Sequence, residues 1–400
     1  MTESPRVIAF FLPQFHSIPE NDTWWGDGFT DWTNTRKATP VFEGHHQPRI
    51  PLGGRYFDLT NTSELVAQSD LAREYGIDAF CFHYYWFQGQ RLLEKPLDLY
   101  SELSETIPFC LSWANENWTR RWDGKKSEKL VEQEYKDETP VEIYNDFRRY
   151  FFNENYLRID GKPVFLVHRV TDLPDPGRVA RQWRSLAKQD GWPDLYLIAS
   201  ETTPGLNPYQ IGFDATVEFP PVGKNTVRNA LLRPPRGLSR QFAGRLLSYP
   251  KLAQYHERRP EPAFNRHRGV MPGWDNSARR GLLATIYVDH SPERYMHWLE
   301  TAIAHERRVR GERGLVFVNA WNEWAEGAYL QPDTVNGMAY LEATRMAVGM
   351  NGTQRLMSDS IPIVRRTWRP SSAIVHSVAG TLGSSLLRAV RIMRSQLRQP

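Results

Sequence analysis

The sequence has little cysteine, no long apolar run and no strong excess of charge of one sign. Its two cysteines in 400 residues, Cys81 and Cys110, each lie inside an apolar run, so we expect buried thiols in a reducing compartment and no disulfide framework. No apolar stretch approaches the roughly 20 residues of a membrane-spanning helix. The N-terminus lacks the basic region of a signal peptide. A cytoplasmic protein is therefore expected.

Several catalytic signatures are also missing. The sequence contains no G-x-x-x-x-G-K-[ST], H-E-x-x-H, C-x-x-C or G-x-S-x-G motif. His45 and His46 are adjacent and lack the helical spacing of a metal-binding pair, and no carboxylate cluster suits a nucleotide-sugar diphosphate with its metal. We therefore expect no metal, no cofactor and, without a recognised module, no nucleic-acid partner.

The charge is unevenly distributed along the chain. Charged residues make up 24% and hydrophobic residues 40%, as in a globular protein, and the net charge is +4. Residues 360–400 carry seven arginines and no Asp, Glu or Lys, so subtracting +7 from +4 leaves about −3 for residues 1–359. The basic character belongs to the C-terminal tail.

The tail has the pattern of an amphipathic helix between residues 382 and 398. The apolar positions are Leu382, Leu386, Val390, Met393 and Leu397. The basic positions on the other side are Arg388, Arg391, Arg394 and Arg398. Such a helix can lie on an anionic membrane, so we expect peripheral membrane contact here, with a solvated tail as the alternative. We divide the chain into a catalytic domain, residues 1–350, and this tail, residues 351–400.

Short apolar, β-branched or aromatic runs recur along the catalytic domain and read as strands. They cover residues 7–15, 78–86, 108–115, 163–168, 195–200, 214–219, 269–274 and 315–321. Most are continuously apolar, as parallel strands buried on both faces are. A further run, ATIYVD at 284–289, could be a strand of its own.

Amphipathic stretches at 62–76, 141–156 and 291–308 fall between these strands. The last begins with Ser291 as a helix cap and Pro292 at the first helical position. Alternating strands and helices predict an α/β fold, a (β/α)8 TIM barrel with long βα loops. A doubly wound sheet is the alternative, although no G-x-G-x-x-G turn follows the first strand.

Tryptophan is unusually common, and its positions favour a carbohydrate site. Ten of the 14 tryptophans lie at or beyond predicted strand ends: 24, 25, 32, 86, 113, 118, 122, 274, 321 and 324. In a barrel these ends meet at the face that carries active sites. Aromatic planes suit the apolar face of a sugar ring, although large rings can also simply cap the core.

Polar residues among these tryptophans could bind sugar hydroxyls. The predicted substrate-binding set is His16, Trp24, Trp25, Asp31, His83, Tyr84, Tyr85, Trp113, Asn115, Glu116, Trp118, Trp274, Asp275, Trp321, Asn322 and Trp324. The expected partner is an oligosaccharide or polysaccharide.

The stretch VNAWNEWAEG, residues 318–327, supplies the candidate catalytic pair, Glu323 and Glu326. In a helical turn residues three apart lie about 5–6 Å from each other, near the carboxyl separation of roughly 5–5.5 Å in retaining glycosidases. Two close carboxyls in a dry pocket cannot both ionise easily, so one should act as acid and the other as base. The alternative is two solvated glutamates on a loop. Glu201 and Glu218 are weaker candidates.

The motif WNEWAEG resembles the catalytic motif of glycoside hydrolase family 99, endo-acting α-mannan enzymes with a (β/α)8 fold. The opening IAFFLPQFHSIPENDTWWGDGFTDW, with FHYYWF, SWANENWTRRWDG and PGWDN, is more similar to family 99-like, WbsX-type proteins associated with lipopolysaccharide O-antigen biosynthesis. The resemblance implies that Glu323 is a base acting on the sugar 2-hydroxyl and Glu326 the acid. Ala325 stands where the hydrolase motif has histidine.

Three functions remain open. The leading hypothesis is an enzyme that cleaves or transfers glycosidic bonds of a surface polysaccharide or its precursor. The second is a glycosyltransferase in lipopolysaccharide biosynthesis, as the similar proteins are labelled. The third is a glycan-binding barrel without catalysis.

Overall fold

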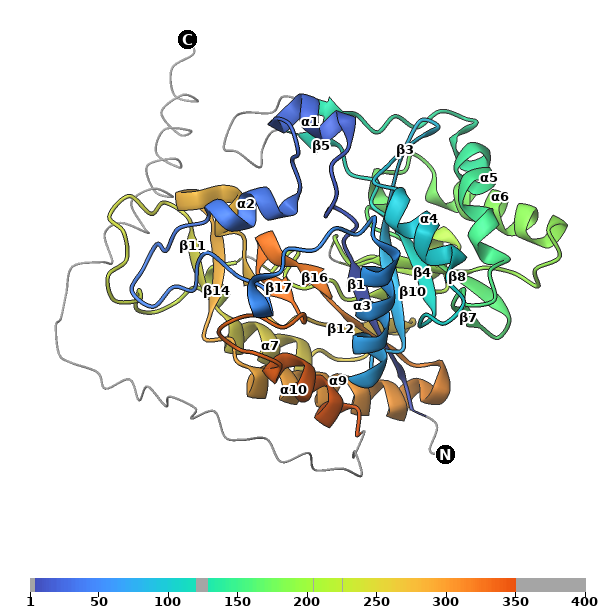
Figure 1. Cartoon of the computed structure of the whole chain (residues 1–400). Coiled ribbons are helices and arrows are strands. Elements are labelled where there is room, and N and C mark those ends of the chain that lie inside the picture. Colours follow the sequence, from blue (N-terminus) through green and yellow to red (C-terminus); the bar gives the residue numbers. More distant parts are fainter. Residues whose placement is uncertain (1–3, 120–128, 204, 225, 350–400) are drawn as a thin grey trace, which may run out of the picture. The chain divides into compact units, whose positions relative to one another are not determined.

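The computed structural model describes residues 4–119, 129–203, 205–224 and 226–349, and these form a closed barrel of parallel strands (Figure 1). The barrel strands are β1 (Arg6–Phe11), β2 (Ala79–Phe87), β4 (Phe109–Trp113), β8 (Lys162–Val167), β9 (Tyr196–Ser200), β10 (Ala215–Val217), β12 (Arg266–Val270) and β15 (Leu315–Val318). Each pairs in parallel with the next in chain order, and β15 pairs with β1. The predicted TIM barrel is therefore confirmed, and the open doubly wound sheet is excluded.

The strand predictions were most accurate where the run is apolar throughout. Each of the eight predicted runs overlaps one barrel strand. For β12 the predicted run begins at 269, although the strand begins at Arg266. The prediction began late because the first residues of this strand are charged or polar. The run at 284–289 becomes β14 (Thr285–Val288), which pairs with β11 (Arg245–Ser248) and β13 (Trp274–Asp275) in a separate small sheet.

Helices surround the barrel in the connections between strands. The longer ones are α3 (Thr62–Glu74), α4 (Lys95–Glu102), α5 (Thr139–Phe151), α6 (Pro176–Gln189), α7 (Tyr249–Glu257), α9 (Pro292–Arg310) and α10 (Ala339–Ala347). As predicted, Ser291 caps α9 by accepting a hydrogen bond from the Arg294 backbone N–H, and Pro292 opens the helix. In the described part of the β9–β10 connection, the 3-10 turn η4 (Pro208–Ile211) takes the place of a longer helix.

Short elements lengthen the loops at the carboxyl ends of the strands. The short helices are α1 (Pro19–Trp25), α2 (Asp31–Lys37) and α8 (Ser277–Arg280). The short strands are β3 (Gln90–Leu92), β5 (Trp118–Thr119), β6 (Lys129–Val131), β7 (Arg158–Ile159), β16 (Asn322–Glu323) and β17 (Ala328–Tyr329). Further 3-10 turns are η1 (Leu52–Gly54), η3 (Val170–Asp172), η5 (Val227–Asn229), η6 (Gly281–Leu283), η7 (Gly311–Arg313) and η8 (Trp324–Glu326). Except for β7 and η7, which come directly before β8 and β15 at the amino ends of those strands, these elements lie in connections that follow a barrel strand.

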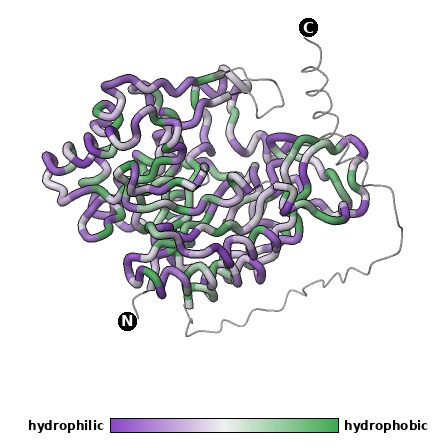
Figure 2. The backbone as a smooth tube through the Cα atoms, turned by 180° about the vertical axis from the view of Figure 1, so that it is seen from behind, coloured by the Kyte–Doolittle hydropathy of each residue, from purple (hydrophilic) through white to green (hydrophobic). Residues whose placement is uncertain are grey.

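Aromatic rings pack on both sides of the barrel wall. Inside, Phe10 packs against Phe219 at 4.9 Å and against Phe317 at 5.5 Å between ring centroids. Outside, Phe165 of β8 stacks on Phe147 of α5 at 4.1 Å. The hydrophobic stretches of the backbone accordingly gather in the middle of the domain (Figure 2). Burial of this apolar surface is the main driving force for the fold.

The two cysteines are buried neighbours. Cys81 and Cys110 lie directly opposite each other on β2 and β4, and both are free thiols. They fill the barrel as small apolar side chains, as the sequence predicted.

The predicted tail, residues 351–400, lies outside the described residues, as does Trp122. The amphipathic helix at 382–398 therefore stays a prediction. Among the residues that the structure describes, no helix is both long and apolar enough to cross a membrane.

Replacing Gly269 with alanine should destabilise the barrel. A Cβ at Gly269 would lie 2.0 Å from the carbonyl oxygen of Glu218 on the chain beside it. We expect Gly269→Ala to lower the free energy of unfolding by about 1–3 kcal/mol, the usual cost of overpacking, as measured by urea denaturation. The control is Gly177→Ala in α6, where a Cβ meets only side-chain atoms at 3.3 Å and beyond. Equal stability of the two variants would contradict this account.

Candidate active site

A single buried arginine holds the predicted catalytic pair together. Arg279, on α8, donates from Nη1 to Glu326 Oε1 at 2.6 Å and from Nη2 to Glu323 Oε2 at 3.1 Å. Its Nη2 also donates to Asp31 Oδ1, on α2, at 2.9 Å. Three loops, which follow β1, β12 and β15, thus bring three carboxyls to one guanidinium. No motif in the sequence around Arg279, NSARRG, points to this role.

The two glutamates are placed by a tight turn after the last barrel strand. Glu323 ends β16, and residues 324–326 form the 3-10 turn η8, which ends at Gly327 with φ of 60°. Asp31 holds this turn from the other side, because its Oδ2 accepts a hydrogen bond from the Ala325 N–H at 3.1 Å. The carboxyls of Glu323 and Glu326, three positions apart, therefore share one partner, as a helical turn at this motif predicts.

Gly327 is required both by its backbone angle and by the space around it. A Cβ there would lie 2.8 Å from Arg49 Nη2. Arg49 in turn donates to Asp275 Oδ2 at 3.1 Å, and the same oxygen meets His45 at 2.8 Å and Gln47 at 2.8 Å. Asp275 was predicted to bind substrate, but it is 1% exposed and its hydrogen bonds are taken up within the protein. Asp275 orients Arg49, which packs against Gly327 in the turn.

Burial raises the pKa of both candidate glutamates. Burial raises the pKa of Glu323 to about 8, and neighbouring Glu326 and Asp31 add to the rise while Arg279 opposes it. The pKa of Glu326 is also raised, chiefly by burial. Because one arginine cannot neutralise three carboxylates, the site keeps at least one proton at neutral pH. The rise in pKa to about 8 favours Glu323 as the group that holds it.

Two buried histidines lie beside the carboxyls. His83 Nε2 is 3.9 Å from Glu323 Oε1, and His168 Nε2 is 4.0 Å from Glu116 Oε1. These gaps are too long for direct hydrogen bonds. The Nδ1 atom of each histidine is buried without a hydrogen-bond partner among the described residues. Burial, with His168 nearby, lowers the pKa of His83 to about 3, so its ring is neutral.

Glu116 is held by Arg169, a residue that no motif in the sequence singles out. Arg169 forms an ion pair with Glu116. Charge on Glu116 contributes to the raised pKa values of Tyr85 and Glu326. Glu116 is therefore close enough to belong to the same site.

Several predicted sugar platforms lie in the core instead. Trp113, Trp321 and Trp324 are at most 1% exposed. Their indole N–H groups donate to the Trp86 carbonyl, to Gln68 and to Gln331. A ring packed on both faces and bonded at its edge has no surface left for a sugar, so for these three the core-capping alternative describes their position.

Three predicted polar contacts are also used inside the protein. The Asn322 amide both donates to and accepts from the Leu12 backbone, at 2.9 and 2.7 Å. Asn115 bonds to the Arg169 backbone. Tyr84 points outward from the barrel, where its hydroxyl bonds to Asp146 of α5. These residues position the loops.

Of the remaining aromatic candidates, Tyr85 lies near the carboxyls, since burial and then the charge of Glu323 raise the pKa of its hydroxyl. Tyr85 contacts Trp118 at 5.2 Å between ring centroids, and Trp118 contacts Trp24 at 5.7 Å. Trp25 and Trp274 are each partly exposed. His16 is 4% exposed, with Nδ1 at 3.1 Å from the Pro13 carbonyl oxygen and Nε2 unpartnered among the described residues.

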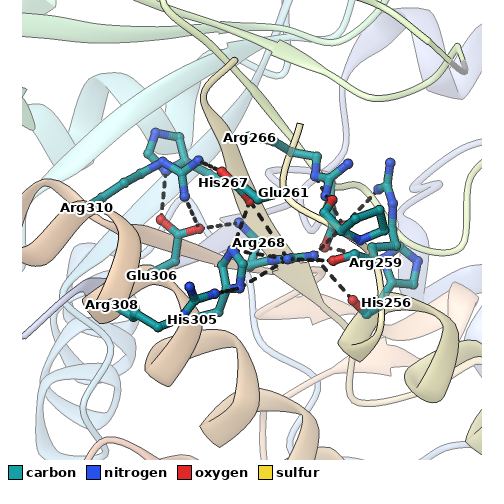
Figure 3. A network of polar contacts seen from close by, with 12 residues as sticks. His256, Arg259, Glu261, Arg266, His267, Arg268, His305, Glu306, Arg308 and Arg310 are labelled. Atoms are coloured by element: carbon teal, nitrogen blue, oxygen red, sulfur yellow. Dashed lines mark hydrogen bonds and ion pairs between the residues drawn. The ribbon is translucent and has the colours of Figure 1, made fainter. Parts of the chain in front are cut away.

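The weaker candidates, Glu201 and Glu218, belong to a different cluster. Arg259 Nη1 lies 2.6 Å from Glu201 and 2.7 Å from Glu218, and Arg268 also contacts Glu218. Burial alone would raise the pKa of Glu218, but His256 and the two arginines lower it below its usual range. This network joins β12 to α7 and α9 (Figure 3). It fastens helices to the barrel and lies apart from Arg279.

Among the residues that the structure describes, no group of three His, Cys, Asp or Glu side chains has the arrangement of a metal site. Asp31, Glu323 and Glu326 converge on a guanidinium, which occupies the centre that a metal ion would need. The positive charge in this site therefore comes from the protein itself.

Comparison with known proteins places the chain among carbohydrate-related sequences. The sequence profile of a family described as Glycosyltransferase WbsX matches residues 7–344. Two curated relatives, each called Uncharacterized protein WxcX and from two strains of Xanthomonas campestris pv. campestris, are 41% identical over 370 residues, which is 90% of this chain and 52% of the relative. The chain thus spans about half the length of these relatives.

Two solved structures share the fold. One, described as a glycoside hydrolase-like protein, matches with a TM-score of 0.55 and 16% identity over 86% of this chain and 94% of that chain. The other is a GH99 endo-alpha-mannosidase from Bacteroides thetaiotaomicron, with a TM-score of 0.53 and 12% identity over 86% of this chain and 96% of that chain. At these identities the likeness concerns the fold alone.

The raised pKa of Glu323 predicts a stability that falls with pH. Glu323 is neutral up to about pH 8 in the folded state, whereas its ordinary pKa is 4.5. Between these pH values folding therefore takes up a proton. The contribution of Glu323 to the free energy of unfolding is greatest below pH 4.5 and is lost as pH rises through 8. Glu323→Gln removes this contribution. We expect its advantage in free energy of unfolding over the unaltered protein to grow from pH 5 to pH 8, as measured by urea denaturation. A pH-independent difference would refute the assignment.

Proposed function

This chain belongs to the Glycosyltransferase WbsX family, and on that premise we propose that it is an enzyme that cleaves or transfers glycosidic bonds of a surface polysaccharide or its precursor. The observation that carries the proposal is the convergence of Glu323, Glu326 and Asp31 on Arg279 at the barrel face where active sites are built. Such chemistry requires one carboxylic acid and one carboxylate near each other.

The raised pKa of Glu323 supports a division of labour within the pair. Glu323 donates its proton to the glycosidic oxygen as the bond from that oxygen to the anomeric carbon breaks. Arg279 lies closer to Glu326 (2.6 Å) than to Glu323 (3.1 Å), which favours the charge on Glu326. Glu326 accepts a proton from the attacking hydroxyl as the oxygen of that hydroxyl bonds to the anomeric carbon. The net result moves one proton from the attacking hydroxyl to the leaving oxygen by way of the two carboxyls. Arg279 stabilises whichever glutamate is charged at each stage.

This division is opposite to the one implied by the resemblance to family 99, in which Glu323 is the base and Glu326 the acid. The two assignments make different demands on the same group. A Glu323 acid must be protonated, whereas a Glu323 base must be ionised. Activity measured across pH 8 therefore separates them.

The surroundings of the pair suit a sugar. Tyr85 offers an aromatic ring near Glu323, and the unpartnered Nδ1 atoms of His83 and His168 could each bond to a hydroxyl. His83 and His168 also lie 3.9 Å and 4.0 Å from Glu323 and Glu116, so a hydroxyl bound by either carboxyl would lie near an imidazole. A glycan with several free hydroxyls would satisfy these groups together.

The attacking hydroxyl decides between hydrolysis and transfer. The fold likeness to a GH99 endo-alpha-mannosidase favours water attacking within a chain, whereas the description of the family favours a sugar acceptor and an activated donor. Calorimetric titration with a panel of nucleotide sugars distinguishes a donor-dependent transferase from an enzyme that acts on finished glycosidic bonds. Glycan binding without any turnover would instead support the non-catalytic barrel.

Replacing either glutamate should abolish turnover while leaving the fold intact. Glu323→Gln and Glu326→Gln each remove a proton carrier, so we expect turnover to fall by about 10²–10⁴-fold. The assay incubates purified protein with bacterial surface polysaccharides and lipid-linked oligosaccharides and analyses the products by mass spectrometry. Glu300→Gln, on an exposed position of α9, is the control. Unchanged turnover in both active-site variants would overturn the proposal.

The pH dependence should show an alkaline limb. Because Glu323 donates a proton and its pKa is raised to about 8, kcat/KM of the unaltered protein should decrease as pH rises through 8. A rate that increases through the same range would assign Glu323 as the base. Arg279→Gln should raise the pH of this limb, since removing the cation makes ionisation of Glu323 harder.

A further inference from the structure

One long connection of the barrel has no acidic residue. From Phe219 to His256 the sequence contains no Asp or Glu. It contains Lys224, Arg228, Arg233, Arg236, Arg240, Arg245 and Lys251. Because the catalytic domain as a whole is slightly acidic, this local excess of positive charge is distinctive.

The fold presents part of this segment to solvent. Arg228, Arg233 and Arg240 are exposed and have no acidic partner among the described residues, whereas Arg236 pairs with Glu43 at 3.1 Å. The segment lies in the β10–α7 connection and includes β11, which pairs with β14 (Figure 1). Residues 236–239 are anchored to the β1–α3 connection, because the Ser239 N–H donates to the Val41 carbonyl at 2.8 Å and the Arg236 carbonyl accepts from the Glu43 N–H at 2.9 Å.

Exposed leucines accompany the arginines. Leu232 is 91% exposed, and Leu283, in η6, is 48% exposed. The turn η6 adjoins the segment, because the Ala243 N–H donates to the Leu282 carbonyl at 2.9 Å. Arg280, also exposed, comes directly before this turn. Aliphatic side chains in water cost free energy unless something covers them.

We propose that this basic loop surface, formed by Arg228, Leu232, Arg233, Arg240, Arg280, Leu282 and Leu283, docks on an anionic lipid bilayer. Arginines meet the lipid phosphates, and the leucines enter the boundary between headgroups and acyl chains. A site for single-stranded nucleic acid would instead set exposed aromatic rings among the basic residues, whereas Phe242, the ring between Arg240 and Arg245, packs against the cluster of Val41, Ala284 and Ile286. The inference does not depend on the proposed enzymatic activity.

The position of the surface has a consequence for the candidate site. Arg280 is adjacent in the chain to Arg279, which holds Glu323 and Glu326. Docking through Arg280 and η6 would therefore bring the loop that carries Arg279 to the bilayer. A glycan attached to a lipid would be presented next to the carboxyls.

Vesicle binding by the full chain tests the proposal. The test variant carries Arg228→Gln, Arg233→Gln, Arg240→Gln and Arg280→Gln. The matched control removes the same charge at exposed positions elsewhere, with Arg181→Gln, Arg307→Gln, Arg308→Gln and Arg313→Gln. Cosedimentation uses vesicles of phosphatidylglycerol and phosphatidylcholine in equal parts. Since each basic residue near such a surface contributes to binding, the test variant should bind at least tenfold more weakly than the control.

A second variant separates lipid insertion from charge. Leu232→Ser with Leu283→Ser leaves the charge unchanged and should also weaken binding, by at least threefold. Equal binding by the test and control variants would show that net charge or the basic tail accounts for the interaction, and would overturn the proposal. Equal affinity for a mixed-sequence single-stranded RNA, lost in the same test variant, would also overturn it.

Discussion

The candidate site depends on one buried guanidinium among three carboxyls. Arg279 is only 7% exposed, and it meets Asp31, Glu323 and Glu326 within 3.1 Å. Without this cation, Asp31 from the loop after β1 and the two glutamates from the loop after β15 would repel one another in a space of low dielectric. With it, the loops after β1, β12 and β15 converge, yet the charge remains incompletely balanced. The imbalance keeps a proton on Glu323 and gives the site its proposed chemistry.

The barrel could be predicted from the sequence because its strands are buried on both faces. Such strands are continuously apolar, so runs such as 163–168 stand out without any knowledge of tertiary structure. The prediction was poorest for β12, whose first residues are Arg266, His267 and Arg268. These side chains are buried by an ion-pair network with α7 and α9 (Figure 3), which no local pattern reveals.

The candidate site could be predicted only in part. The turn that carries Glu323 and Glu326 is local, so their spacing was informative. Arg279 lies in a short stretch, NSARRG, that reads as an exposed loop, and its importance arises from residues far away in the sequence. Tryptophans at strand ends were ambiguous for a physical reason: the same large ring can fill a core completely, as Trp321 does, or stay partly exposed, as Trp25 and Trp274 do.

The cation of this site belongs to an insertion rather than to the barrel. Arg279 lies on α8, which connects β13 to β14, two strands of the small sheet that is separate from the barrel. Evolution could therefore shorten or exchange that insertion while leaving the eight strands and the glutamate turn untouched. A homologue altered in this way would keep the motif WNEWAEG yet hold its two acids with a different electrostatic balance. Proteins that share this motif would then differ in the number of protons that their sites hold at a given pH.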